Sequence, residues 1–110
     1  MMKHMMVRYK VKEDKADEAK EAIFDFVDAV KTNEPATLVY QVFQDNTESL
    51  ILFHFMVFED EYAQTLHRKS SYVKKFVDLI YPLCAEEPVF TVLNLVRESG
   101  GGEPKLPPSA

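Results

Sequence analysis

The chain has 110 residues, of which 46% are hydrophobic and 28% are charged, and its formal net charge is −5. This length accommodates one hydrophobic core, and the composition is that of a folded globular domain rather than of a disordered chain. Acidic and basic residues are interspersed without a basic stripe, so nucleic acid is not an expected partner.

The N-terminal part of the chain predicts a strand followed by a helix. From Met5 to Val11, apolar side chains recur at every second position, which is the period of a strand. From Asp14 the apolar spacing changes to three and four residues. This spacing predicts an amphipathic helix of about five turns, which must end before Pro35.

The rest of the chain predicts three more strands and two more helices. Residues 37–44 and 50–58 are rich in β-branched and aromatic residues and are joined by a polar turn, which indicates a hairpin. Helices are predicted over 60–67 and 72–83, and a last strand over 89–96, after Pro88. Residues 98–110 hold all three glycines and three of the six prolines. We therefore expect one domain over 1–97 and a flexible tail over 98–110.

The order of these elements, βαββαβ, predicts an α+β fold of the ferredoxin-like type. Two right-handed crossovers place the helices on one face of a four-stranded antiparallel sheet. The other face has no helix to cover it, although residues 50–58 and 89–96 are apolar on both sides of their strands. A second copy that packs sheet against sheet is the expected cover, so we predict a homodimer through this face.

Three features of the sequence predict a protein of the reducing cytoplasm. Cys84 is the single cysteine, which excludes an internal disulfide. Residues 1–6 are too short and too polar for the apolar part of a signal peptide. The longest mainly apolar run, residues 50–58, is far below the roughly 20 residues that span a bilayer, so no membrane association is expected.

Three segments carry a family resemblance that extends over residues 5–96. They read NEPATLVYQVFQD at 33–45, FEDEYA at 58–63 with His67 beyond it, and YVKKF at 72–76. In these segments the chain resembles the antibiotic biosynthesis monooxygenase family of dimeric α/β barrels. The family commonly has glycine where this chain has Ala36 and tryptophan where it has Phe58, and this chain contains no tryptophan.

The resemblance implies a pocket between sheet and helices in each subunit, and it favours an enzyme. The implied activity is a monooxygenase reaction on a small aromatic or quinol-like molecule, with no metal, flavin or nicotinamide. The substrate would then supply the electrons, and the protein would supply a general base and polar groups that hold a substrate anion. The alternative is a non-catalytic small-molecule binder, or a stress-responsive dimeric α/β barrel of unassigned activity.

The candidate site residues are two histidines and a set of aromatic side chains. His67 matches the family's histidine and is our candidate base or donor; the alternative is a helix-end histidine that only complements the helix dipole. His54 lies in the middle of a predicted strand, where it either bonds inside the dimer core or projects into the pocket. The aromatic residues either contact the substrate or pack in the core, and they are Phe58, Tyr40, Tyr72 and Phe76.

Overall fold

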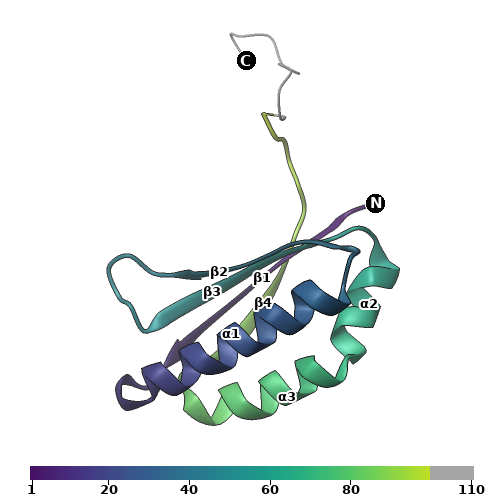
Figure 1. Ribbon diagram of the computed structural model, residues 1–110. Coiled ribbons are helices and arrows are strands. Elements are labelled where there is room, and N and C mark those ends of the chain that lie inside the picture. Colours follow the sequence, from purple (N-terminus) through teal and green to yellow (C-terminus); the bar gives the residue numbers. More distant parts are fainter. Residues whose placement is uncertain (100–110) are drawn as a thin grey trace, which may run out of the picture.

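In the computed structural model, which describes residues 1–99, the chain forms one antiparallel sheet and a layer of helices (Figure 1). This is the α+β ferredoxin-like fold that the sequence predicted. Of the expected tail, residues 100–110 lie outside the described part of the chain. The elements in chain order are β1 (Lys3–Val11), η1 (Glu13–Lys15), α1 (Ala16–Asn33), β2 (Thr37–Gln44), β3 (Ile51–Phe58), α2 (Glu61–Lys69), α3 (Ser71–Ile80), η2 (Tyr81–Leu83) and β4 (Cys84–Leu93). In the sheet the strands have the order β2-β3-β1-β4.

The core lies between the sheet and the helices α1 and α3, which run side by side across one face (Figure 1). The strand β1 buries every second residue from Val7 to Val11, and α1 buries residues at three- and four-residue spacing. The buried residues of the β1 alternation and of the α1 spacing, both visible in the sequence, therefore pack in one core. None of the helices within residues 1–99 is long and apolar enough to cross a membrane.

The last strand differs from its predicted range of 89–96. The observed strand β4 runs over Cys84–Leu93 and includes Pro88. Pro88 is tolerated because β4 is an edge strand that pairs with β1 alone, so a missing N–H need not break a second ladder. The pairing register between β1 and β4 also shifts between Arg8 and Lys10, close to Pro88. An irregularity of this kind can accommodate the proline ring.

The two later helices follow their predictions with small changes at the ends. Asp60 is the N-cap of α2, and its carboxylate accepts the backbone N–H of Ala63 at 2.9 Å. The helix predicted over 72–83 is regular only to Ile80, and residues 81–83 continue as a 3-10 turn with Pro82 at its start. Pro82 has no backbone N–H to donate to the preceding turn, which explains the change of helix type.

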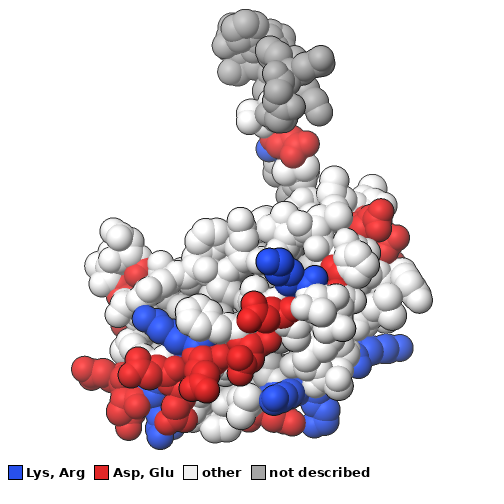
Figure 2. Space-filling model, viewed as in Figure 1, with Lys and Arg blue, Asp and Glu red and all other residues white. Residues whose placement is uncertain are grey.

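The face of the sheet opposite the helices has no cover in the single chain (Figure 1). Large apolar side chains are exposed there: Phe43 is 50% exposed and Val89 is 58% exposed. Acidic side chains gather over the helical layer (Figure 2). The helix-free face also has two ion pairs, Arg8 with Glu86 and Lys10 with Glu48. A sheet face with large exposed apolar side chains is typical of a surface that packs against another protein.

Candidate functional site

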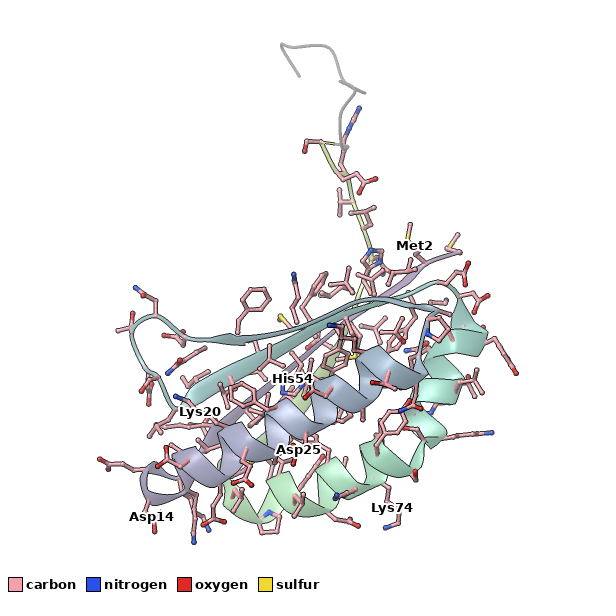
Figure 3. The ribbon with its side chains drawn as sticks, in the orientation of Figure 1. Met2, Asp14, Lys20, Asp25, His54 and Lys74 are labelled. Atoms are coloured by element: carbon pink, nitrogen blue, oxygen red, sulfur yellow. The ribbon has the colours of Figure 1, made fainter. Side chains whose placement is uncertain are left out.

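A cavity of about 360 Å³ lies between the helix-facing side of the sheet and the helices. Its walls are mostly apolar and aromatic, and His54 projects from β3 into the layer between sheet and helices (Figure 3). Phe26 from α1 and Phe76 from α3 stack in its wall with ring centroids 4.4 Å apart. A cavity of this volume and lining is of the size that binds small organic molecules.

The structure brings most of the predicted site residues together at this cavity. Tyr72 is not among its lining residues; it borders a smaller hollow of about 100 Å³ between α1 and α3. Those that do line the 360 Å³ cavity are His67, His54, Tyr40, Phe58 and Phe76. Their contacts with a ligand stay predictions.

A buried carboxylate holds His67 in place. The side chain of Glu34, which follows the last residue of α1, is 7% exposed. It lies 2.9 Å from Nδ1 of His67, and it accepts hydrogen bonds from the hydroxyls of Thr37, at 2.6 Å, and Tyr72. An ionised carboxylate only accepts, so Nδ1 of His67 carries a proton and donates it. A hydrogen bond of this kind fixes the tautomer and the ring orientation of a histidine.

The second ring nitrogen of His67, Nε2, has no hydrogen-bond partner within residues 1–99. In the neutral ring with a protonated Nδ1, this nitrogen has the lone pair. His67 thus combines a fixed orientation with a nitrogen that is available as a base, at the wall of an apolar cavity. That combination is the chemical requirement for a general base.

Tyr72 acts on this arrangement from outside the cavity. Burial, and then its hydrogen bond to Glu34, raise the pKa of Tyr72 to about 12. The phenol therefore keeps its proton at neutral pH and donates it to the carboxylate. Tyr72 and Thr37 together compensate the desolvation of the Glu34 charge, which would otherwise be costly to bury.

Deeper in the cavity, a histidine connects two tyrosines. The hydroxyl of Tyr9 lies 2.8 Å from Nε2 of His54, and that of Tyr40 lies 2.8 Å from Nδ1. Tyr9 is 1% exposed and His54 is 2% exposed. Burial, and then the nearby His67, lower the pKa of His54 to about 3, and burial raises the pKa of both phenols. The three side chains are therefore neutral at neutral pH.

The neutral state of His54 predicts a loss of stability on acidification. In the unfolded chain a histidine has a pKa near 6.5, so between about pH 6.5 and pH 3 the unfolded state binds the additional proton. Lowering the pH from 7 to 5 should therefore reduce the free energy of unfolding by about 2 kcal/mol through this residue alone.

Urea unfolding at the two pH values and one protein concentration measures this effect. The matched variant is His54→Gln, which removes the titrating ring and retains a polar side chain. The wild-type protein should lose about 2 kcal/mol more than the variant on acidification. Equal losses in the two proteins would show that His54 is not the group that titrates.

Other titratable groups give no sign of a metal or thiol site. Within residues 1–99, no three His, Cys, Asp or Glu side chains are grouped as metal ligands would be. The thiol of Cys84 donates to the backbone carbonyl of Ile80 at 3.3 Å, and burial raises its pKa. A protonated, partly buried thiol is a poor nucleophile.

Comparison with known proteins identifies the family. The family model described as antibiotic biosynthesis monooxygenase matches residues 2–79. The chain belongs to this family. A search of curated proteins gave no match. His54, His67 and Glu34 therefore lie on the scaffold of this monooxygenase family.

Solved structures agree with the family assignment. A candidate antibiotic biosynthesis monooxygenase from Caulobacter crescentus is 29% identical, with a TM-score of 0.82 over 87% of this chain and 91% of that chain. Another from Nitrosomonas europaea is 17% identical, with a TM-score of 0.80 over 90% and 94% of the two chains. A Mycobacterium tuberculosis protein is 15% identical, with a TM-score of 0.82 over 91% and 100%. The last two likenesses bear on the fold alone.

Sequence reasoning missed Glu34 and Tyr9, which form hydrogen bonds with the two histidines of the site. Glu34 stands in the segment that carries the family resemblance, between the end of a predicted helix and Pro35, but no local signal marks a buried carboxylate. Tyr9 lies on the apolar side of the first strand and is easily interpreted as core. A phenol one residue from the centre of the strand predicted over 5–11 was the one signal available.

Proposed function

We propose that the protein is a monooxygenase that acts on a small aromatic or quinol-like molecule in the 360 Å³ cavity, with the substrate as the source of electrons. The observation that carries the proposal is His67, held by Glu34 at Nδ1 and available at Nε2 in an apolar wall. Membership of the monooxygenase family supports an oxygen-inserting reaction. The stacked rings of Phe26 and Phe76 support a planar ligand.

Anthrone, an aromatic ketone with a reactive CH₂ group at C10, illustrates the chemistry. Nε2 of His67 takes one proton from C10, and the conjugated anion passes one electron to dioxygen. The two radicals combine into a C10–O bond, and the proton returns from His67 to the distal oxygen. Loss of the second C10 proton with cleavage of the O–O bond leaves a carbonyl and releases water. Anthrone and O₂ thus give anthraquinone and H₂O, and the substrate provides all four electrons.

The protein's part in this sequence is proton transfer and solvent exclusion. A positioned general base accelerates a proton transfer by about 10²- to 10⁴-fold. The apolar cavity keeps water away from the substrate anion, which strengthens every hydrogen bond that the anion accepts. These residues, the substrate and dioxygen together supply every group that the steps require.

Oxygen uptake tests the proposal directly. The wild-type protein, mixed with a panel of anthrones and quinols, should consume one O₂ per anthrone and form one anthraquinone, faster than heat-denatured protein. An oxygen electrode measures the O₂ consumed, and the absorbance of the quinone measures the anthraquinone formed. Binding of panel members without uptake above the denatured control would contradict a monooxygenase and support a non-catalytic small-molecule binder.

We also infer that two copies pair through the helix-free face of the sheet. Members of this family are typically dimers. In the single chain this face exposes Phe43 and Val89 and leaves Phe53 and Phe55 of β3 half-buried. Packing sheet against sheet would remove these side chains from water at about 25 cal/mol per Å² of apolar surface.

A further inference from the structure

The chain of Tyr9, His54 and Tyr40 has one more proton than its internal bonds can use. Two phenol hydroxyls and one imidazole N–H give three protons, and the chain contains two hydrogen bonds. A neutral His54 donates to one tyrosine and accepts from the other. The tyrosine that accepts therefore retains its own O–H, whichever tautomer is present, and no further acceptor bonds to either hydroxyl within residues 1–99.

The position of this spare proton makes it a binding feature. Tyr9 and His54 are almost fully buried, and a buried donor without an acceptor is unfavourable. Both tyrosines line the 360 Å³ cavity. We propose that the Tyr9–His54–Tyr40 chain is a hydrogen-bond donor site for an oxygen atom of an aromatic ligand, either a ketone or the enolate formed from it.

The chemistry of the surrounding residues favours an oxygen of this class. A neutral, buried donor suits a neutral carbonyl, and it also suits a delocalised anion whose charge has moved onto oxygen. The low pKa of His54 supports the neutral chain, since a cationic ring would donate to both tyrosines and leave two spare protons. A ligand therefore needs no acidic group to be bound by this donor.

The distance to His67 gives the donor site a place in the reaction. The rings of Tyr40 and His67 have centroids 5.6 Å apart, so both side chains border one ligand volume. When His67 removes the C10 proton of anthrone, negative charge moves through the ring system to the carbonyl oxygen. A donor at the carbonyl and a base at the CH₂ group would then act on opposite ends of one ligand. In this respect the inference rests on the proposed function.

Two probes with the same three-ring carbon skeleton test the donor site. Anthrone has the carbonyl oxygen, and 9,10-dihydroanthracene lacks it. Titrated without oxygen, the wild-type protein should bind anthrone about tenfold more tightly than dihydroanthracene, since one buried donor gains an acceptor. In the double variant Tyr9→Phe/Tyr40→Phe this preference should disappear, while the affinity for dihydroanthracene stays the same and reports an intact cavity.

Two further measurements apply if the double variant does not fold. The anthrone oxygen accepts from one of the two hydroxyls, so of the single variants Tyr9→Phe and Tyr40→Phe, the one that removes this hydroxyl should lose the preference for anthrone. In wild-type protein with ¹³C-labelled tyrosine, the Cζ resonance of Tyr9 or Tyr40 should shift with anthrone and not with dihydroanthracene. A preference that survives in both single variants, or no selective shift, would overturn the inference.

The outcomes separate the donor site from the proposed function. Equal affinity of wild-type protein for the two probes, with anthrone-dependent oxygen uptake intact, would overturn the donor site alone. A tenfold preference without oxygen uptake would support the donor site and contradict the monooxygenase. Binding of neither probe would overturn both, because the cavity would then not accept a planar aromatic molecule.

Discussion

Replacing His67 by asparagine is expected to slow anthrone-dependent oxygen uptake by about 10²- to 10⁴-fold, because the variant has no base. The amide nitrogen of asparagine can take the place of Nδ1 and continue to donate to Glu34. No lone pair replaces Nε2, so proton removal from the substrate loses its acceptor. Initial rates of oxygen uptake give kcat/KM, and thermal unfolding reports whether the fold is retained.

His67→Ala should affect both activity and stability, which makes it a useful comparison. It leaves the buried carboxylate of Glu34 with Thr37 and Tyr72 as its remaining donors. Loss of a donor to a buried charge commonly costs about 1–3 kcal/mol or more. Lys69→Asn, at an exposed position on the same helix, should change neither quantity. A rate for His67→Asn within tenfold of wild type, in a folded protein, would exclude His67 as the base.

Glu34 gives a second, graded comparison for the same base. It does not line the cavity and acts through His67, so it is a positioning residue. Glu34→Gln retains the shape of the side chain but lets the histidine adopt either tautomer. The arrangement therefore loses the charge that favours a protonated Nδ1, and a partial loss of rate is the consequence.

The elements of the fold could be predicted because their signals are local. The alternation in β1 and the three- and four-residue spacing in α1 are each contained in fewer than twenty residues. The start of β4 could not be predicted in this way, since Pro88 normally argues against a strand. Its tolerance depends on the position of β4 at the sheet edge, which is a property of the topology and not of the local sequence.

The candidate site could be predicted only in part, for the same reason. His67 and His54 are rare residue types at marked positions, so they attracted attention by themselves. Glu34 acquires its role from His67 and Tyr72, which are 33 and 38 residues away in the chain. Tyr9 acquires its role from the register of β1 and β3, in which Val7 lies opposite His54. Neither pairing has a trace in the neighbouring sequence.

Replacing Phe55 by aspartate is expected to convert the protein from a dimer into a folded monomer. Phe55 lies on β3, on the helix-free face of the sheet, and is half-buried in the single chain. A charge at this position is therefore hydrated in the monomer but would be unpaired and desolvated in a sheet-to-sheet interface. The neighbouring Val57 is a poorer choice, because at 7% exposed it is already buried within one chain.

Light scattering at micromolar concentration measures this outcome. Wild-type protein should have about twice the chain mass of 12.7 kDa, and Phe55→Asp should have the mass of one chain with an unchanged circular dichroism spectrum. The control is Phe24→Asp on α1, a phenylalanine that is 69% exposed on the helical side of the molecule. It introduces the same charge away from the proposed interface and should leave the dimer intact. Should Phe24→Asp dissociate the protein while Phe55→Asp stays dimeric, the two copies would pair through their helices instead of their sheets.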